Sequence, residues 1–232
     1  MTTNRREQIR ANLAAINARI DIACAEAGRS RDDVTLIVVT KTHPASDIDH
    51  LVELGVHDIG ENRHPEAGRK LTEVVGPRPR LHFIGALQTN KAGAVAGYAD
   101  VVHSVDRLRL VDALDRGART ADREIGCLVQ IDFGDADGRS GAPPDEVPAI
   151  AESVASTDGL RLDGVMTVAP LGADPSPVFD RLRRISDELR RDHPAAKVIS
   201  AGMSDDFELA INSGATHLRV GRLILGERVS LG

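Results

Sequence analysis

Lys41 is the side chain whose position most favours chemistry. It directly follows an apolar, β-branched run, 35–40, which is too short for a helix and too continuous for a half-exposed strand. A lysine at the carboxyl end of a buried parallel strand faces the place where α/β folds bind ligands. Desolvation lowers the pKa of a lysine, and the neutral amine can form a Schiff base. A solvated lysine at a strand end fits this short segment better when the segment is taken alone.

The segment 200–204 and Gly221 suit an anion. Gly202 lets the backbone approach a ligand closely, and Ser204 is expected to start a helix whose free N–H groups attract negative charge. The loops after the seventh and eighth strands form the recurrent phosphate site of (β/α)8 barrels. An ordinary helix cap and a tight turn explain the same residues. Lys41 strengthens the phosphate interpretation, because barrel closure brings the first, seventh and eighth strands together.

Arg219 places a charge between Leu218 and Val220 in an otherwise apolar run. A buried charge is costly unless it is paired, so two interpretations stand. Arg219 pairs with a carboxylate at an exposed strand end, or its guanidinium faces the ring nitrogen of a bound pyridine cofactor. In the second case the ring nitrogen stays unprotonated, because arginine keeps its own proton, and the ring is a weaker electron sink.

The remaining polar groups predict no metal site. Four histidines recur every seven residues across expected strand ends and loops, a spacing attributed to chance: His43, His50, His57 and His64. Residues 135–139 resemble a Ca²⁺ loop but lack its number of ligands and its terminal glutamate. Cys24 and Cys127 are expected to be small buried residues rather than a disulfide or a metal pair.

Strand-like and helix-like segments alternate along the chain. The expected strands are 35–40, 56–60, 81–84, 101–104, 127–133, 160–168, 198–200 and 216–220. An amphipathic helix over 9–24 is expected to end at Gly28, and further helices are expected over 48–54, 62–75, 90–96, 145–155, 176–192 and 205–212. Asp106 and Ser204 are expected to cap the helices that follow them.

This alternation predicts an α/β fold with parallel strands joined by crossover helices. Eight such units in 232 residues fit a closed (β/α)8 TIM barrel. Residues 1–232 are therefore expected to form a single domain with an extra N-terminal helix. An open doubly wound sheet would show a glycine fingerprint after the first strand, where Lys41, Thr42, His43 and Pro44 stand instead.

Composition argues against several classes of partner. The net charge is -6 with both signs interspersed, and 2% of residues are aromatic, which disfavours a nucleic-acid partner. The N-terminal residues 1–10 are polar and charged, and no apolar stretch is long enough to cross a bilayer. We therefore expect a cytoplasmic protein without a membrane partner.

Six motifs occur in order along nearly the whole chain. They are Val39-Thr40-Lys41-Thr42-x-Pro44, Gly60-Glu61-Asn62, His82-Phe83-Ile84-Gly85-x-Leu87-Gln88-x-Asn90-Lys91, His103-Ser104-Val105-Asp106-Arg107, Gly202-Met203-Ser204-Asp205-Asp206 and Arg219-Val220-Gly221. With these motifs the chain resembles the pyridoxal phosphate homeostasis proteins, also called the YggS-like or proline-synthetase co-transcribed family. The third and fifth motifs are the specific ones.

The resemblance implies a barrel related to the N-terminal domain of alanine racemase. It implies that pyridoxal 5′-phosphate (PLP) is held as an internal aldimine on Lys41, with Asn62 beside it and Arg219 facing its ring nitrogen. The residues implied for the phosphate are Ser200, Gly202, Met203, Ser204, Gly221 and Arg222. Arg222 stands where a small hydroxyl residue is common, so the resemblance implies a backbone contact there rather than a side-chain contact.

The resemblance implies a protein that holds the cofactor and hands it on, without clear catalytic turnover. PLP-dependent apo-enzymes would be the recipients. An amino-acid racemase and a lysine aldolase acting on a sugar phosphate remain alternatives. A racemase needs a second positioned base, and Tyr98, the only tyrosine, falls at an expected helix end. The chain ends soon after the eighth strand, without the second β-domain of such racemases, which favours a monomer.

Overall fold

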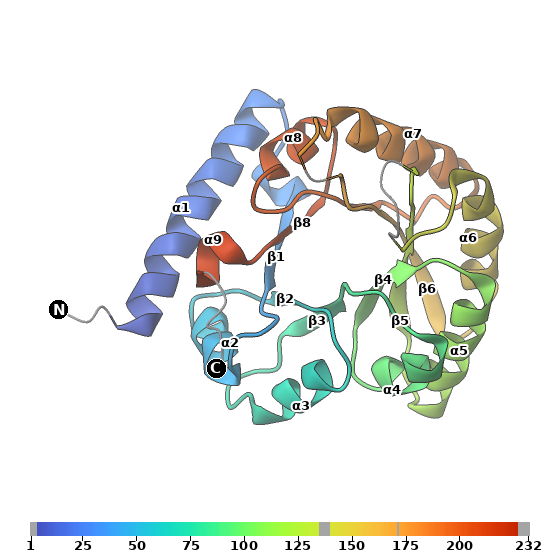
Figure 1. Cartoon of the computed structure of the whole chain (residues 1–232), viewed down its shortest axis with the longest axis horizontal. Helices are drawn as coiled ribbons and strands as arrows, with labels where there is room; N and C mark the ends of the chain where they lie inside the picture. Colours follow the sequence, from blue (N-terminus) through green and yellow to red (C-terminus); the bar gives the residue numbers. More distant parts are fainter. Residues whose placement is uncertain (1–3, 135–139, 171, 227–232) are drawn as a thin grey trace.

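Eight parallel strands close into a barrel in sequence order (Figure 1). The structure is a computed structural model that describes residues 4–134, 140–170 and 172–226. The strands are β1 (Thr35–Val39), β2 (Asp58–Glu61), β3 (Arg80–Phe83), β4 (Val101–Val105), β5 (Ile125–Gln130), β6 (Leu160–Met166), β7 (Val198–Ser200) and β8 (His217–Val220). Pairing of β1 with β8 closes the barrel, with Ile37 opposite Arg219. The predicted (β/α)8 barrel is confirmed.

Helices surround the barrel in Figure 1. They are α1 (Arg5–Glu26), α2 (Ala45–Glu53), α3 (Glu66–Glu73), α4 (Ala92–Ala96), α5 (Leu108–Thr120), α6 (Val147–Ala155), α7 (Ser176–Asp192), α8 (Phe207–Asn212) and α9 (Arg222–Leu225), with 3-10 turns at Arg31–Asp33, Thr89–Lys91 and Pro144–Glu146. Since every crossover returns the chain to the same end of the barrel, the loops after all strands meet at one mouth.

The extra N-terminal helix, α1, packs on the outside of the barrel against α8 and α9. Its apolar face is buried at helical spacing, and Gly28 follows it in the left-handed conformation, with φ of 65°. Arg5 ties the start of α1 to the rest of the fold. Its guanidinium donates to both carboxylate oxygens of Asp47 in α2 and to the carbonyl of Leu225 in α9.

The predicted cap of α8 is wrong. This helix begins at Phe207 rather than at residue 205, and Asp206 stands at its N-cap. The Met203 N–H donates to Asp206 Oδ1 at 2.6 Å. The carboxylate therefore closes the turn before the helix, and Ser204 takes no part in a cap.

Helices α3 and α5 also begin later than predicted, and α4 and α6 begin two residues late because a 3-10 turn precedes each of them. Helix α3 begins at Glu66 rather than at residue 62, because Pro65 stands at its N-cap after the loop that leaves β2. Helix α5 begins at Leu108 with Arg107 at its N-cap. The predicted cap residue, Asp106, pairs with the Arg107 guanidinium instead.

Strand β5 spans a different range from the one predicted over 127–133. It begins at Ile125 and ends at Gln130, because Ile131 leaves the strand and pairs with Ala142 through an isolated bridge. The short helix α9 was not predicted. Cys24 and Cys127 are buried and unpaired, as predicted. Among the described residues, no helix has the length and apolarity to span a membrane.

Candidate functional site

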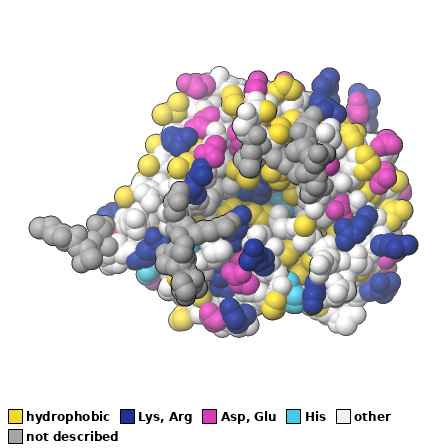
Figure 2. Space-filling view, in the orientation of Figure 1, with side chains coloured by type: hydrophobic (Ala, Val, Ile, Leu, Met, Phe, Trp, Pro, Cys, Tyr) yellow, Lys and Arg dark blue, Asp and Glu magenta, His cyan; other side chains and the backbone are white. Residues whose placement is uncertain are grey.

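A cavity of about 550 Å³ opens at the mouth of the barrel, where the chain leaves β1, β7 and β8. The space-filling view in Figure 2 is hollowed near the centre of this face. The lining residues are Val39, Lys41, Thr42, His43, Ile84, Met203, Ser204, Asp205, Arg219, Gly221, Arg222 and Gly226. A volume of this size suits a small ligand or cofactor.

Lys41 lies just beyond β1 and lines the cavity, with its side chain partly exposed rather than fully buried. Hydrogen bonds hold the backbone on both sides of it. Lys70 Nζ donates to the Thr40 carbonyl at 2.9 Å, and the Thr42 N–H donates to Glu66 Oε1 at 3.3 Å. Thr42 has φ of 67°, a conformation that a β-branched residue keeps only when its surroundings impose it. The position of Lys41 is therefore imposed by its neighbours.

Lys70 belongs to a group that we call the lysine network, made of the buried Thr40, Glu61 and Lys70 and the half-buried Glu66. Glu61 Oε1 accepts from Lys70 Nζ and from Thr40 Oγ1, each at 2.6 Å, and Lys70 lies 3.7 Å from Glu66. Burial raises the pKa of Glu61, although Lys70 and Thr40 oppose that rise. Sequence reasoning missed this network, because a Glu66–Lys70 pair at helical spacing usually lies on a solvated face.

Arg219 is buried, with 5% of its surface exposed, and lines the cavity from β8. Its two Nη groups donate to Ser200 Oγ at 2.5 Å and to the Thr167 carbonyl at 2.8 Å. Both acceptors are uncharged, so these contacts do not form the carboxylate pair that the sequence left open. Burial lowers the pKa of Arg219 to about 10, with Asp206 opposing. The guanidinium thus stays cationic at neutral pH beside the cavity.

The glycines of the last two loops are required by close packing. Gly202 has φ of 88°, and a Cβ there would lie 2.9 Å from the Phe207 Cα. A Cβ on Gly221 would lie 2.8 Å from the Val39 carbonyl oxygen. Met203 and Ser204 line the cavity, whereas the buried Gly202, which precedes them in the chain, does not. Backbone after β8 therefore comes close to the end of β1, and backbone after β7 packs tightly against the start of α8.

Three other predicted residues lie in different settings. Ser200 is fully buried beneath the cavity, where its hydroxyl bonds Arg219 and His103. Asn62 is half-buried after β2 and does not line the cavity. Arg222 lines the cavity and pairs with Asp205, and both side chains are exposed. The structure thus brings together most, but not all, of the predicted residues.

His43 is a cavity residue that the sequence analysis set aside. It lines the cavity two residues after Lys41, and its Nδ1 lies 3.5 Å from Asp47 Oδ2. Burial lowers its pKa, with Asp47 opposing. The seven-residue spacing of the histidines carried no information about the site. The useful signal was that His43 stands two residues after Lys41.

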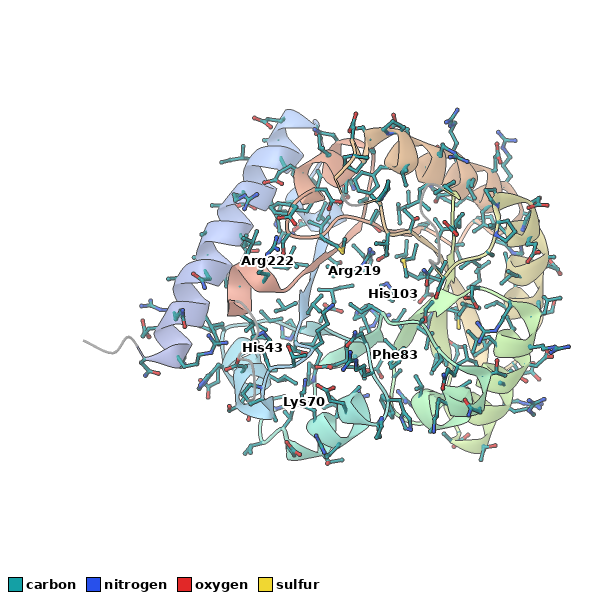
Figure 3. All side chains as sticks on the ribbon, viewed as in Figure 1. His43, Lys70, Phe83, His103, Arg219 and Arg222 are labelled. Carbon is teal, nitrogen blue, oxygen red and sulfur yellow. The ribbon has the colours of Figure 1, made fainter. Side chains whose placement is uncertain are left out.

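His82 and His103 were also missed as functional candidates, and Figure 3 places His103 with Arg219 near the middle of the barrel. His82 Nδ1 lies 2.8 Å from His103 Nε2, and His103 Nδ1 lies 3.0 Å from Ser200 Oγ. A polar residue inside an apolar strand was the signal that singled out Arg219. The same signal was present at both histidines.

Tyr98, weighed from the sequence as the base of a racemase, falls outside this cavity. Tyr98 follows α4 and stacks on His64 at a ring distance of 6.0 Å, and it does not line the cavity. Burial raises the pKa of Tyr98 to about 12. The Ca²⁺-like loop at 135–139 lies outside the described residues. No group of three or more potential metal ligands occurs within the ranges that the structure describes.

Comparison with known proteins supports one family. The model of the alanine racemase N-terminal domain matches residues 11–229. A pyridoxal phosphate homeostasis protein of Corynebacterium glutamicum is 39% identical over 221 residues, covering 92% of this chain and 99% of that protein. The protein of the same name in Escherichia coli is 34% identical over 223 residues, covering 94% of this chain and 95% of the relative.

Solved structures agree with the barrel. PipY of Synechococcus elongatus, solved with PLP bound, is 31% identical, has a TM-score of 0.83 and covers 94% of this chain and 100% of its own. An alanine racemase of Clostridium difficile is 16% identical with a TM-score of 0.75, covering 97% of this chain and 58% of its own. At that identity the racemase supports the fold alone.

Proposed function

This chain belongs to the pyridoxal phosphate homeostasis protein family, and we propose that it binds pyridoxal 5′-phosphate covalently through Lys41. In this proposal the protein holds the cofactor as a Schiff base and takes part in intracellular PLP homeostasis without catalytic turnover. The observation that carries the proposal is that one cavity is lined by Lys41, by the buried Arg219 and by the loops after β7 and β8.

The residues of the cavity fit this cofactor. Lys41 supplies the amine that a cofactor aldehyde needs. Arg219 supplies a charged donor whose known acceptors are uncharged, so a ring nitrogen facing it would accept rather than carry a proton. A bound cofactor in this class supplies an electron sink, and Arg219 would weaken that sink.

The phosphate is assigned to the loops after β7 and β8. Met203, Ser204, Gly221 and Arg222 line the cavity, and Gly202 precedes Met203 in the loop after β7. Arg222 adds a positive charge at this end, which favours an anion even though it pairs with Asp205. Ser200 is assigned a supporting part, because its hydroxyl is already bonded to Arg219 and His103. Asn62 is assigned a place at the edge of the cofactor.

Weak racemase-like activity is the second candidate, and one observation favours it. His43 lines the cavity close to Lys41 and carries a carboxylate, Asp47, behind it, as a general base would. Homeostasis is preferred because the relatives carry that name. Racemisation of a free amino acid that is lost in His43→Ala would favour the enzyme instead.

Further parts of the proposal concern the setting of the protein. We propose that residues 1–232 act as one PLP-binding unit, that the protein is a cytoplasmic monomer, and that PLP-dependent apo-enzymes receive the cofactor from it. Sedimentation of the loaded protein tests the monomer. Transfer of the cofactor to an added apo-enzyme, faster than from free solution, tests the handover.

Borohydride trapping tests the covalent link directly. The protein is incubated with PLP, reduced, digested and mapped by mass spectrometry. We expect one modified peptide, which contains Lys41, and no modification in Lys41→Ala. Lys91→Ala is the matched control, because Lys91 is exposed and lies outside the cavity. Modification spread over several surface lysines, or retained in Lys41→Ala, would refute the proposal.

A further inference from the structure

A continuous hydrogen-bonded chain crosses the interior of the barrel beneath Arg219. Four residues form it, and we call it the histidine relay: Asp58, His82, His103 and Ser200. His82 Nε2 lies 2.9 Å from Asp58 Oδ1, and the contacts from His82 to His103, from His103 to Ser200 and from Arg219 to Ser200 measure 2.8, 3.0 and 2.5 Å. The relay joins β2, β3, β4 and β7 to β8.

The three inner members of the relay are buried, out of contact with water. His82 and His103 are 1% and 0% exposed, and Ser200 is 0% exposed. Only Asp58, at the start of β2, reaches solvent, with 20% of its side chain exposed. Buried polar groups of this kind are costly unless every hydrogen is matched with an acceptor.

The chemistry of the two ends restricts the directions that the hydrogen bonds can take. Burial alone would raise the pKa of Asp58, but the hydrogen bond from His82 and nearby positive charge lower it, so Asp58 is a carboxylate and only accepts. Arg219, at the other end, only donates. Burial lowers the pKa of His103 well below its usual value, so this imidazole is neutral.

One arrangement of hydrogens satisfies these conditions and also gives every hydrogen in the relay an acceptor. His82 donates from Nε2 to Asp58, His103 donates from Nε2 to His82, and Ser200 donates to His103 Nδ1. The Ser200 oxygen is then free to accept from Arg219. A second proton on His82 would turn each hydrogen toward Ser200, and the buried Ser200 hydroxyl hydrogen would lose its acceptor. The neutral arrangement is therefore the stable one.

We propose that His103 is a positioning residue for Arg219, acting through Ser200 to hold the guanidinium toward the cavity. This inference depends on the proposed function, because the group that Arg219 meets in the cavity is the ring nitrogen of the bound cofactor. The Thr167 carbonyl holds the second Nη. With both Nη groups bonded to fixed acceptors, the orientation of the guanidinium is set by the barrel itself.

Other charged groups surround the relay and set limits on its test. His217 lies 6.2 Å from the His82 ring. The positive charge of Arg80 lowers the pKa of His103 and of Asp58. The negative charge of Asp206 opposes the fall in the pKa of Arg219. His217→Asn is therefore a matched control, since it changes a neighbouring histidine that has no hydrogen bond to the relay.

Nitrogen NMR of the protein without cofactor tests the arrangement of hydrogens. We expect His82 and His103 each to carry one hydrogen, on Nε2, with Nδ1 bare. A hydrogen on His103 Nδ1 would overturn the proposal, because Ser200 would then no longer donate to His103.

The loaded protein tests the effect on Arg219. His103→Leu removes the acceptor for Ser200, while His103→Asn keeps an oxygen near the position of Nδ1. We expect His103→Leu to shift the absorption maximum of the bound cofactor and to weaken its retention about tenfold, the loss of roughly one charge-assisted hydrogen bond. His103→Asn should restore most of both, and His217→Asn should change neither.

The outcomes separate this proposal from the proposed function. If the unchanged protein is not trapped at Lys41, the proposed function fails. If it is trapped, and His103→Leu has the spectrum and retention of the unchanged protein, the positioning role fails. If His103→Leu does not fold, Ser200→Ala gives the same comparison, since it cuts the chain at its last member. An unshifted spectrum in Ser200→Ala would then refute the positioning role.

Discussion

Two polar networks support two of the basic side chains that line the cavity, Lys41 and Arg219, and the networks are built differently. The lysine network behind Lys41 contains full charges on Glu61 and Lys70. The histidine relay behind Arg219 has its only charge at Asp58, and its inner members are neutral in the arrangement derived above. One network anchors the backbone beside its basic residue, whereas the other bonds the side chain itself.

This difference follows from where each network acts. Lys70 bonds a backbone carbonyl next to Lys41, so its charge is used to fix a chain position. A charge placed at His103 would lie close to the buried guanidinium of Arg219, and like charges repel strongly where water is excluded. Neutral donors and acceptors orient Arg219 without that repulsion.

The largest effect is expected where the charged network is broken. Lys70→Ala leaves the buried Glu61 carboxylate without its cation, and we expect the free energy of unfolding to fall by about 3–5 kcal/mol. Urea unfolding measures it. Lys91→Ala, at an exposed site, should stay within about 0.5 kcal/mol. A loss below about 1 kcal/mol in Lys70→Ala would mean that the lysine network is not the support described here.

The coupling inside that network is the next test. Lys70→Met leaves the buried Glu61 carboxylate without a cation, and Glu61→Leu leaves Lys70 with only the more distant Glu66, whereas the double variant removes both partners of the short ion pair. We expect the double variant to lose less stability than the two single losses together, by about 1–3 kcal/mol. Losses that simply add would show that Glu61 and Lys70 do not act as a pair.

Acid should lower the stability that depends on the neutral histidines in and beside the histidine relay. Burial lowers the pKa of His217 to about 4 and holds that of His103 well below its usual value. Between pH 6.5 and about 4 the unfolded chain therefore binds more protons, so the free energy of unfolding falls as pH falls, by up to about 1.4 kcal/mol per pH unit for each histidine. Unfolding curves across this range measure the slope, which His217→Asn should reduce.

In the lysine network, the contribution of Glu61 to the free energy of unfolding changes with pH in the opposite direction. Because the pKa of Glu61 is raised by burial, the folded chain holds that proton more tightly, and its contribution to stability is lost as pH rises through the folded value. Glu61→Gln should therefore steepen the acid loss caused by the histidines. If the slope of the free energy of unfolding against pH is unchanged in Glu61→Gln, Glu61 does not contribute to the pH dependence of stability.

The smallest change in stability is expected at Lys41 itself. Its side chain is partly exposed and lines the cavity, so Lys41→Ala should alter the free energy of unfolding of the cofactor-free protein by no more than about 0.5 kcal/mol. The same variant should lose covalent cofactor binding completely. A large loss of stability would show that Lys41, like Lys70, has a structural part.

Much of the site was readable from the chain because its residues stand where strands end. Lys41, Ser204 and Gly221 each follow a strand, and barrel closure then brings them to one mouth. The caps were less predictable. Asp206 closes the turn before α8 rather than Ser204, because either side chain is a good cap and only the path of the loop selects one.

By itself, the sequence determined the eight-stranded barrel, the extra N-terminal helix and the family, since alternation of apolar segments and local motifs depend on neighbours along the chain. Only the tertiary structure decided that Lys70 supports Lys41 and that His103 reaches Arg219 through Ser200. The hydrogen-bonded pairs involved are Lys70–Thr40, His103–Ser200 and Arg219–Ser200, whose members lie 30, 97 and 19 positions apart. Hydrogen bonds over such separations depend on side-chain directions inside a closed barrel, which no periodicity in the sequence records.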